Sequence, residues 1–529
     1  MSPACAPSLA QDTLKARPLA NEGNWNRVYE IAIAVLIGAG FFLLLRATPD
    51  LPGGTDGYRH VKQASRLITE PKAMFADPWR LAYFWRVPVD AWFGYHLMLA
   101  PFAFFFDLIT AIKLLTSVIF GLIAYVMFLL LRHLQANHRA FWVLLAMTGS
   151  SMTLSRATTV RPFLLSVLLT LLVALLTVQH KPVKLALVSL IHAVSYTMFF
   201  LVGIAPALWF LLRRDRRSGV ATLWCAAGVG LGLLANPYFP ENLRFDLVQA
   251  NVMSIAQAAH VKIAAELAPP DSWWSILSWL PAALPWLCAV ILRLSHRRQT
   301  APAPVTDLLM LISGVLFLGT LRVVRTADFF IPFAILFAAS ILSPYLKLSR
   351  ADVAVIGLLF SIPCAANVYL THAYVLAAPS LDRFRGASAY LKKNAPDALV
   401  MNTEWAPDYF LLFFLNSRSR YVIGIDPTFM YLTDPRKYWF WRHIWADEPA
   451  TCDHEHCAGA EWTDIVSATR KELGAQYIVT DHANNPRLET ILKKNIEVTE
   501  AYRDSALSVY RIDSCLGRSG CPPPGVRGY

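Results

Sequence analysis

The feature of this sequence that most constrains its fold is a series of apolar runs long enough to cross a lipid bilayer. A helical span needs about 20 mostly apolar residues. Only 16% of the 529 residues are charged, against about 25% in soluble domains, which excludes soluble, disordered and small disulfide-rich classes. The sequence therefore predicts a polytopic α-helical membrane protein with about 11 transmembrane helices. The expected spans are residues 28–46, 111–132, 140–154, 162–179, 183–196, 198–213, 219–235, 274–294, 305–321, 328–346 and 351–372.

Basic residues in short loops predict the orientation of the chain. They gather at Arg132 with Arg139, Lys181 with Lys184, residues 213–217, Arg293 with Arg297 and Arg298, and Lys347 with Arg350. Short basic loops face the cytoplasm, so the N-terminus is predicted inside and the C-terminus outside. The first apolar run has no small-residue cleavage site after it and is expected to remain as an anchor. These loops explain much of the net charge of +12, and nucleic acid is not expected as a partner.

The same topology divides the chain into four parts. They are a cytoplasmic tail (1–27), a transmembrane domain (28–372) with outer loops 47–110 and 236–273, a periplasmic α/β domain (373–512) and a flexible tail (513–529). In the α/β domain, helix-like stretches (382–394, 464–473, 485–494) alternate with β-rich runs (398–402, 420–424, 476–480, 506–512), as α/β folds do. Residues 93–106 are expected to form a helix at the outer surface, because a twelfth span there would invert every later loop.

Two close pairs of cysteines lie in the outer C-terminal region. Cys452 with Cys457, and Cys515 with Cys521, would each form a small disulfide loop in an oxidising compartment. The segment CDHEHC (452–457) also carries the two Cys and two His of a metal site. The sequence leaves both interpretations open.

The segment GGTDGYRHVKQASRLI (53–68) carries the main catalytic candidate, Asp56. Glycines on both sides let the backbone approach a ligand closely. A carboxylate at the membrane surface can act as a general base or bind a metal ion. Tyr58 and His60 follow two and four positions later. The alternative is that Thr55 or Asp56 simply caps a helix.

Four arginines fall in short loops predicted to be outside: Arg156, Arg161, Arg322 and Arg325. Positive charge is disfavoured in such loops, so these residues need another explanation. Arginine binds phosphate through paired hydrogen bonds, and a phosphate at the outer leaflet would be such an explanation. Pairing with acidic residues such as Asp328, or with lipid head groups, is the alternative.

Other polar candidates lie near the outer surface. Asn236, Glu241 and Arg244 open the second outer loop (ANPYFPENLR), where a plain turn into an interfacial helix is the alternative. His192 lies within the fifth predicted span, and an intramembrane ionisable residue is a functional candidate, although a hydrogen bond to a neighbouring helix would also account for it. Asp77 and Asp90 lie in the first outer loop beside tryptophans that can anchor at the interface or stack on sugars.

Familiar soluble-enzyme motifs are missing from the sequence. There is no Walker loop, dinucleotide fingerprint or Ser-His-Asp signature. An active site outside the membrane has no nucleotide sugar or ATP available, so its donor has to come with the membrane. A carboxylate near the bilayer, with arginines for a phosphate, fits such a donor.

The layout resembles the GT-C superfamily of integral-membrane glycosyltransferases, which includes the protein O-mannosyltransferases, the lipid A aminoarabinose transferase and the oligosaccharyltransferase catalytic subunit. Residues 56–60 (DGYRH) are similar to the Asp-x-Tyr-Tyr-His segment of the oligosaccharyltransferase first loop, with Arg59 as the departure. Residues 93–132 are similar to a helix-plus-span unit of the O-mannosyltransferases. SRATTVRPFLL, ANPYFPENLR, LRVVRTADFFIPF and residues 400–431 look like regions of uncharacterised bacterial members, whose tryptophan-glycine motif keeps only Trp405 here.

This resemblance implies a glycosyltransferase of a bacterial inner membrane. Asp56 would be the base that activates an acceptor hydroxyl or amide, and the donor would be a sugar on polyprenyl phosphate or pyrophosphate. Arg322 and Arg325 would stabilise the departing phosphate. The other substrate-binding candidates are Tyr58, His60, Arg156, Arg161, His192, Asn236, Glu241 and Arg244. Some members need a divalent metal such as Mg²⁺ or Mn²⁺, for which Asp56, Asp77 and Glu241 are the candidate ligands.

The acceptor, which the sequence leaves open, would be a protein, a glycan or another lipid. Two other functions use the same features. A lipid-linked glycan transporter or flippase would use the outer arginines but needs polar residues along a path through the bilayer, and the spans carry few charges. A non-catalytic assembly subunit would use the C-terminal domain to bind a partner.

Overall fold

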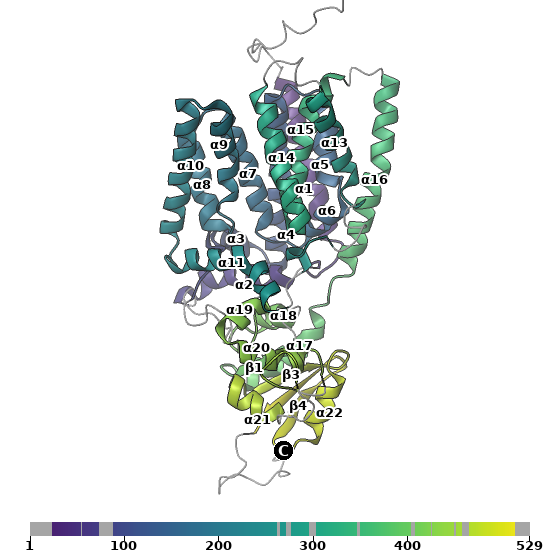
Figure 1. The fold of residues 1–529 in the computed structure, drawn as a ribbon. Helices are drawn as coiled ribbons and strands as arrows, with labels where there is room; N and C mark the ends of the chain where they lie inside the picture. Colours follow the sequence, from purple (N-terminus) through teal and green to yellow (C-terminus); the bar gives the residue numbers. More distant parts are fainter. Residues whose placement is uncertain are drawn as a thin grey trace, which may run out of the picture.

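The computed structural model describes residues 24–53, 55–72, 88–261, 265–270, 277–295, 303–345, 350–403, 408–424, 426–448, 451–457 and 465–513. A bundle of apolar helices carries a small domain with a mixed sheet at one end (Figure 1). The bundle helices are α1 (Asn24–Leu45), α4 (Leu108–His133), α5 (Arg139–Thr148), α6 (Ser151–Thr158), α7 (Phe163–Val178), α8 (Pro182–Ser195), α9 (Leu201–Arg213), α10 (Arg216–Ala235), α13 (Leu280–Ser295), α14 (Pro304–Arg322), α15 (Ala327–Leu342) and α16 (Arg350–Leu376).

Six helices of the described chain are long and apolar enough to cross a bilayer. They are Trp25–Leu45, Leu108–His133, Arg216–Ala235, Pro304–Arg322, Val324–Leu342 and Val355–Leu376, and α6 with α7 makes a seventh if the bent pair is one span. The other apolar helices, among them α5, α8, α9 and α13, are only 10–17 residues long. The membrane class is thus confirmed, but the structure does not support the predicted count of 11 full spans.

The predicted third span, residues 140–154, is wrong because the helix breaks inside it. Helix α5 ends at Thr148, and Ser150 caps a new helix by accepting a hydrogen bond from Thr153 N at 3.2 Å. A side-chain oxygen at this position satisfies a helix-start N–H. The chain then bends by 117° between the short helix α6 and α7. This break gives the chain a sharp corner at residues 159–162.

The two ends of the bundle differ in what they carry. Near the start of α1, Glu30 pairs with Arg132 and Arg139 at the link between α4 and α5. Helices α2 (Thr55–Thr69), α3 (Phe93–Phe105) and α11 (Glu241–Ala258) lie at the other end, beside the sheet domain (Figure 1). The predicted outer loops and C-terminal region therefore share one end of the bundle. Which end faces the cytoplasm stays a prediction.

The C-terminal sheet has the strand order β2-β1-β3-β5-β4. Its strands are β1 (Leu399–Asn402), β2 (Arg420–Tyr421), β3 (Tyr477–Asp481), β4 (Val498–Arg503) and β5 (Leu507–Ile512). The first three pair in parallel, and β5 runs antiparallel to both β3 and β4. The four β-rich runs seen in the sequence are confirmed as strands. Strand β4 was missed, because it lies at the sheet edge with little burial and no apolar run.

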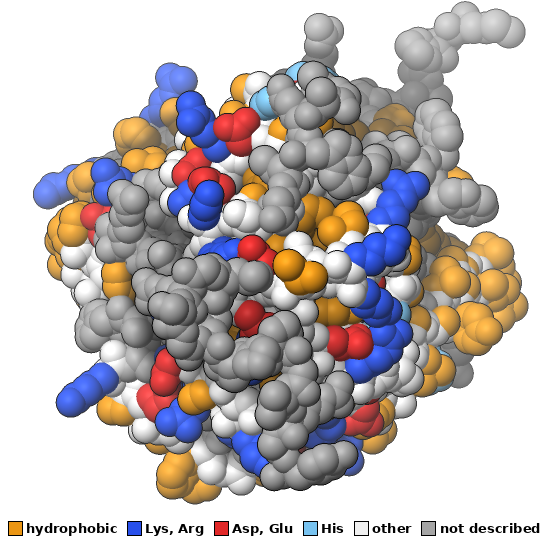
Figure 2. Space-filling view, turned by 90° about the horizontal axis from the view of Figure 1, so that it is seen from below, with side chains coloured by type: hydrophobic (Ala, Val, Ile, Leu, Met, Phe, Trp, Pro, Cys, Tyr) orange, Lys and Arg blue, Asp and Glu red, His pale blue; other side chains and the backbone are white. Residues whose placement is uncertain are grey.

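Helices cover this sheet and connect it to the bundle. They are α17 (Asp382–Asn394), α18 (Asp408–Leu415), α19 (Pro427–Thr433), α20 (Pro435–Trp445), α21 (Ile465–Ala468) and α22 (Pro486–Lys494). Phe429 of α19 stacks on Phe245 of α11 with ring centroids 5.1 Å apart. Tyr58 of α2 meets Phe414 of α18 edge-on at 5.0 Å. These aromatic contacts dock the small domain on α2 and α11. Seen from this end, basic and acidic side chains are interspersed over the surface, and hydrophobic side chains project at its edge (Figure 2).

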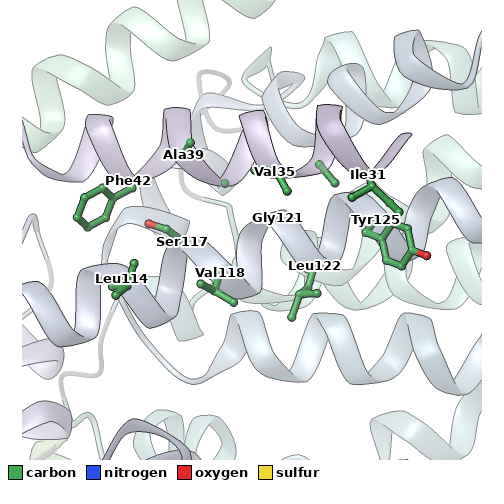
Figure 3. Close-up of a pocket in the computed structure, with 12 residues that line it drawn as sticks. Ile31, Val35, Ala39, Phe42, Leu114, Ser117, Val118, Gly121, Leu122 and Tyr125 are labelled. Carbon is green, nitrogen blue, oxygen red and sulfur yellow. The ribbon is translucent and has the colours of Figure 1, made fainter. Parts of the chain in front are cut away.

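Helices α1 and α4 form an apolar groove on the flank of the bundle. A Cβ added to Gly121 would lie 2.9 Å from Ala34 O, so the glycine permits this close crossing. The groove has a volume of about 640 Å³. Figure 3 shows the lining side chains, which run from Ile31 and Tyr125 at one end to Phe42 and Leu114 at the other. Such a lining fits a hydrocarbon chain.

Candidate functional site

An ionic cluster forms where the corner between α6 and α7 meets three other segments. Arg156 comes from α6, Arg161 from the corner and Arg325 from the turn Val324–Thr326 before α15. Glu266, from the short turn Ala265–Leu267, lies between them. The structure therefore brings three of the four arginines singled out in the sequence to one carboxylate.

The distances show a closed network. Glu266 Oε2 accepts hydrogen bonds from Arg156 Nη1 and Arg161 Nη1, both at 2.6 Å, and Glu266 Oε1 lies 3.8 Å from Arg325 Nη1. Arg156 also donates from Nε to Asp328 Oδ2 at 2.9 Å. The pairing of an arginine with Asp328, offered above as an alternative to a ligand phosphate, is thus present. The site combines three cations with the carboxylates of Asp56, Glu266 and Asp328.

Asp56 joins the cluster from the first turn of α2. Its Oδ2 lies 3.1 Å from Arg161 Nε, and its side chain is 25% exposed. Gly57 makes this approach possible, because a Cβ there would lie 2.4 Å from Val160 Cγ2. Val160 has a φ of 52°, which is unusual for a β-branched residue. Strained backbone of this kind clusters at functional sites, and here it aims the Arg161 side chain at Asp56.

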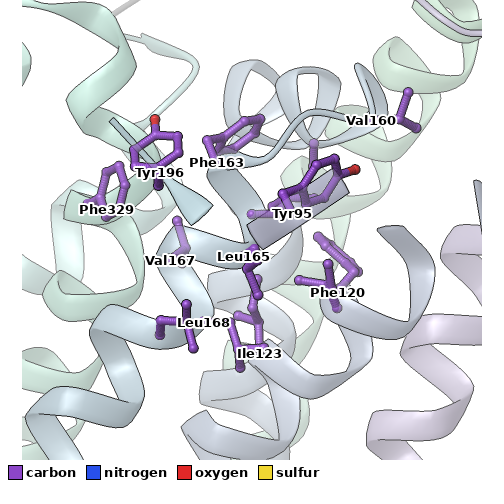
Figure 4. Close-up of a cluster of buried hydrophobic side chains, with 14 of the residues drawn as sticks. Tyr95, Phe120, Ile123, Val160, Phe163, Leu165, Val167, Leu168, Tyr196 and Phe329 are labelled. Atoms are coloured by element: carbon purple, nitrogen blue, oxygen red, sulfur yellow. The ribbon is translucent and has the colours of Figure 1, made fainter. Parts of the chain in front are cut away.

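Aromatic rings hold the arginines from the bundle side. Arg325 donates from Nη2 to the Tyr196 hydroxyl at 2.6 Å, and its guanidinium lies 5.6 Å from the ring centroid. Arg156 lies 5.2 Å from the centroid of Phe163. These rings belong to the buried apolar layer beneath the cluster, where Phe163, Tyr196 and Phe329 lie together (Figure 4). Planar guanidinium groups stack well on aromatic faces, so Arg156 and Arg325 are fixed in place by these rings.

The environment keeps Glu266 ionised. Its burial alone would raise the pKa of the carboxyl, but Arg161, Arg156 and Arg325 lower the pKa by more, so that it falls well below its usual value. Two donors of the cluster, Arg161 Nε and Arg325 Nε, are buried and make no hydrogen bond within the described residues. Arg161 Nε has only the unaligned ion pair with Asp56. Buried donors without acceptors are rare, and in this site they suit an anionic ligand.

Tyr58 and His60 face away from solvent. The Tyr58 hydroxyl accepts a hydrogen bond from Leu51 N at 3.0 Å and donates to Asp50 Oδ1 at 3.3 Å, which fixes the chain between α1 and α2. His60 bonds through Nδ1 to His96 of α3 at 2.8 Å. Both side chains are buried. Their predicted role in substrate binding stays a prediction, although Tyr58 has a structural role as well.

The remaining candidates lie in other surroundings. His192 of α8 is buried and bonds through Nε2 to Ser166 Oγ at 2.7 Å. Asn236 ends α10, and its side-chain oxygen accepts a hydrogen bond from Tyr238 N at 3.0 Å. Glu241 and Arg244 pair with each other at 3.3 Å on α11. Within the described chain, no ion pair or hydrogen bond joins any of these four to the arginine cluster.

Arg322, the last residue of α14, is exposed and has no ion-pair partner among the described residues. Arg322 and Arg325 therefore lie in different surroundings, although they are only three positions apart in the sequence. Asp77, Trp405, Cys515 and Cys521 lie outside the described residues. The structure joins Cys452 and Cys457 in a disulfide beside His443. Disulfide sulfurs are not thiolate ligands. The ligand atoms of His443, Cys452 and Cys457 nevertheless lie within 4.8 Å of one another, so these three side chains could hold a metal ion if the cysteines were reduced.

Sequence reasoning missed Glu266, the residue at the centre of the cluster. It lies in AAELAPP, a segment with no spacing that marks it. One signal could have indicated Glu266. A carboxylate in the second outer loop is a natural ion-pair partner for arginines in the other outer loops. Asp90, noted with Asp77 beside tryptophans but given no role, contacts His96 at 2.5 Å; His96 itself was not selected.

Comparison with known proteins finds solved structures with a similar fold. No protein-family model and no curated protein sequence matches the chain. The oligosaccharyltransferase of Archaeoglobus fulgidus in its apo form matches with a TM-score of 0.63 at 12% identity, over 89% of this chain and 71% of that one. The same enzyme tethered to an acceptor peptide with an NVT sequon matches with a TM-score of 0.60 at 12% identity, over 87% and 70% of the two chains. Its complex with Zn and sulfate gives 0.57 at 11% identity, over 88% and 69%. The predicted resemblance to GT-C membrane glycosyltransferases is thus confirmed at the level of the fold, which this chain shares with an archaeal oligosaccharyltransferase.

Proposed function

We propose that this protein is a membrane glycosyltransferase. It moves a sugar from a polyprenyl-phosphate or pyrophosphate donor to an acceptor at the outer face of a bacterial inner membrane. The orientation that this requires has the N-terminus in the cytoplasm and the C-terminal domain in the periplasm. The short helices α5, α8, α9 and α13 would complete the membrane domain beside the six longer ones. All 11 predicted spans would then contribute to one bundle, several of them as short or broken segments.

One observation carries the proposal. A partly exposed carboxylate, Asp56, lies 3.1 Å from Arg161 in a cluster of half-buried arginines, at the end of the bundle that bears the sheet domain (Figure 1). Glycosyl transfer from a lipid phosphate needs a group that activates the acceptor and cations that stabilise the phosphate as it departs. The unsatisfied Nε donors of Arg161 and Arg325 suit those phosphate oxygens.

Arg322 and Arg325 were both predicted to stabilise the leaving phosphate, but their different surroundings suggest different roles. Arg325 is held by Tyr196 and lies within the cluster, so it fits a fixed, preorganised cation. Arg322 is exposed at the end of α14, where it would meet a phosphate or lipid head group only from outside. A guanidinium that is fixed in advance costs no reorganisation during reaction. We therefore assign the main charge-stabilising role to Arg325 and Arg161.

Asp56 and Glu266 are the candidate ligands for a divalent metal ion such as Mg²⁺ or Mn²⁺, which would have to compete with Arg161 for both carboxylates. Asp56 and Glu266 offer carboxylate oxygens, the ligands that such hard cations prefer, and both contact the same arginine. Glu241, named earlier as a ligand, pairs with Arg244 instead. A bound metal ion would supply Lewis-acid stabilisation of phosphate charge. The archaeal neighbour is known in complex with Zn and sulfate.

The groove between α1 and α4 supports a lipid partner. Its apolar lining suits a hydrocarbon chain, and Phe42 at one end lies just before the segment that leads to Asp56 (Figure 3). For the acceptor, the archaeal neighbour carries a tethered peptide with an NVT sequon. A peptide amide is thus one acceptor to test, beside hydroxyl acceptors on glycans and lipids.

The first experiment measures sugar release and transfer from a panel of labelled polyprenyl-phosphate and polyprenyl-pyrophosphate sugars by the purified protein. Wild type is compared with Asp56→Asn, which keeps the size of the side chain but removes its charge. Glu70→Gln is the matched control, because Glu70 directly follows the last residue of α2 and its exposed side chain pairs with Arg66. We expect turnover in wild type and in the control, and a loss of at least about 100-fold in Asp56→Asn.

Donor binding and thermal stability are measured in parallel. Turnover that survives in Asp56→Asn would contradict the assigned role. A folded wild type that binds the lipids but turns over none of them would favour the transporter or flippase. A folded wild type that neither binds nor turns over any donor would favour the non-catalytic assembly subunit.

A further inference from the structure

A cluster of one histidine and two cysteines lies in the sheet domain, on elements that contribute nothing to the arginine cluster. The ligand atoms of His443, Cys452 and Cys457 all lie within 4.8 Å of one another. His443 and Cys452 are buried, and Cys457 is partly exposed. The disulfide between the two cysteines explains why their sulfurs are close. It does not explain why a buried histidine lies beside them.

The end of α20 presents His443 to the cysteines. His443 lies in the last turn of this helix, and the chain reverses after it so that Glu448 N donates to His443 O at 3.0 Å. Asp447 permits the reversal with a φ of 53°, a conformation that aspartate tolerates better than most residues. The same turn brings Glu448 Oε2 into a hydrogen bond with His443 Nδ1. The other ring nitrogen, Nε2, lies 3.7 Å from Cys452 Sγ.

These contacts have the geometry of a zinc site. With Zn–S bonds of about 2.3 Å and Zn–N bonds of about 2.1 Å, a sulfur and a nitrogen on one tetrahedral ion lie about 3.6 Å apart. The distance from His443 Nε2 to Cys452 Sγ is 3.7 Å. A histidine that binds zinc usually donates its other N–H to a carboxylate, and Glu448 occupies that position. Thiolate and imidazole ligands suit Zn²⁺ and not Mg²⁺ or Ca²⁺.

We propose that His443, Cys452 and Cys457 bind one Zn²⁺ ion when their disulfide is reduced. A dithiol reductant supplies two electrons and two protons and is itself oxidised to a disulfide, which leaves Cys452 and Cys457 as thiols. His443 Nε2 lies 2.8 Å from His454 O, and a carbonyl only accepts, so Nε2 carries a proton in the disulfide state. Zn²⁺ replaces this proton and the two thiol protons, which pass to solvent, and water fills the fourth position.

A metal ion can reach this site from solvent. Cys457 is partly exposed, and the side chains of His454 and His456 in the same loop are 50% and 91% exposed. The loop also contacts the membrane domain, because His260 Nδ1, just after α11, lies 3.3 Å from Glu455 Oε1. A change from disulfide to zinc therefore alters a loop that meets the second outer loop, six positions before Glu266.

The test counts zinc in the purified full-length protein carrying Cys515→Ser and Cys521→Ser, which remove the other outer cysteine pair. The protein is reduced with a phosphine, desalted without air, mixed with ZnCl₂ and desalted again, and bound zinc is measured by mass spectrometry. We expect one more Zn²⁺ per chain than in the protein with the intact disulfide. X-ray absorption at the zinc edge should show sulfur neighbours only in the reduced protein. No additional zinc after reduction would overturn the proposal.

Variants decide which side chains hold the ion. Competition with a chromophoric chelator measures zinc affinity, and the melting temperature is measured in parallel. We expect His443→Gln to lose the additional zinc and Glu448→Gln to bind it about 10- to 100-fold more weakly. His456→Gln is the matched control, because its ring is exposed in the same loop, and it should bind zinc like the unsubstituted site.

If His443→Gln fails to fold, Glu448→Gln decides the question, since Glu448 is half-exposed and contacts the metal ligand only from behind. Unchanged zinc affinity in Glu448→Gln would overturn the proposal. So would equal losses in His443→Gln and His456→Gln, which would mean that the loop binds zinc without using the buried histidine. Neither outcome depends on sugar transfer, so this test is separate from that of the proposed function.

Discussion

Arg161 holds Asp56 and Glu266 at the same time: its Nε lies 3.1 Å from Asp56 Oδ2, and its Nη1 lies 2.6 Å from Glu266 Oε2. One planar guanidinium thereby joins two carboxylates from segments far apart in the sequence. Arginine can do this because its donors form a rigid fork. This link connects the start of α2 to the second outer loop and to the corner between α6 and α7.

Replacing Arg161 by lysine keeps the charge but removes the fork. A single ammonium group is unable to reach Asp56 and Glu266 in the same geometry, so we expect Arg161→Lys to reduce sugar transfer at least 10-fold. Arg322→Lys is the matched control, because Arg322 is exposed and has no ion-pair partner in the described ranges. Transfer rates with a polyprenyl-linked donor give the answer. Equal losses in both variants would mean that the fork of Arg161 has no special role.

Removing the charge of Glu266 should destabilise the protein. In Glu266→Gln, Arg156 and Arg161 lose their shared carboxylate but keep Asp328 and Asp56 as partners. The loss of stability should therefore stay below the roughly 3–5 kcal/mol that a fully unpaired buried charge costs. The pKa of Glu266 is lower in the folded protein than in the unfolded chain. The ionised carboxylate therefore stabilises the folded protein at neutral pH, and this stabilisation is lost as the pH falls below the ordinary pKa of a glutamate. Thermal unfolding in detergent measures both effects. We expect a decrease in melting temperature at pH 7 that shrinks in acid; an unchanged melting temperature would contradict the closed network.

A methyl group at Gly57 should push Asp56 away from Arg161. The added Cβ of Gly57→Ala would lie 2.4 Å from Val160 Cγ2, and such overpacking costs about 1–3 kcal/mol. We expect lower stability and lower transfer activity. Gly40→Ala is the control, because a Cβ at Gly40 meets nothing within 4 Å. If Gly57→Ala behaves like Gly40→Ala, α2 does not need its close contact with the corner.

Asp246 should make stability depend on pH in the opposite direction. Burial raises the pKa of this α11 side chain to about 8, so the folded protein keeps a proton that the unfolded chain loses above its ordinary pKa of about 4. Stability should therefore fall as the pH rises from about 4 to 8, by a few kcal/mol at most. Asp246→Asn should melt higher than wild type at pH 8 and at nearly the same temperature at pH 4. A difference that does not vary with pH would exclude this explanation.

The sequence alone was enough to determine the membrane class and most of the sheet strands, and it singled out Asp56 and the outer arginines as candidates, whose roles stay predictions. Apolar runs, alternating patterns and misplaced charges are local signals, and they survive folding because each depends only on residues close together in the chain. The break at Ser150 was less visible, since the apolar run continues through it.

Only the tertiary structure decided which charges meet. Arg325 enters the cluster and Arg322, three positions away, does not, because the end of α14 and the following turn point them into different surroundings. Glu266 became central, and His60 acquired His96 and Asp90, through contacts between segments that are distant in sequence. Ion pairs and hydrogen bonds act over a few ångströms, so their partners depend on how helices pack, and no spacing within one segment records that.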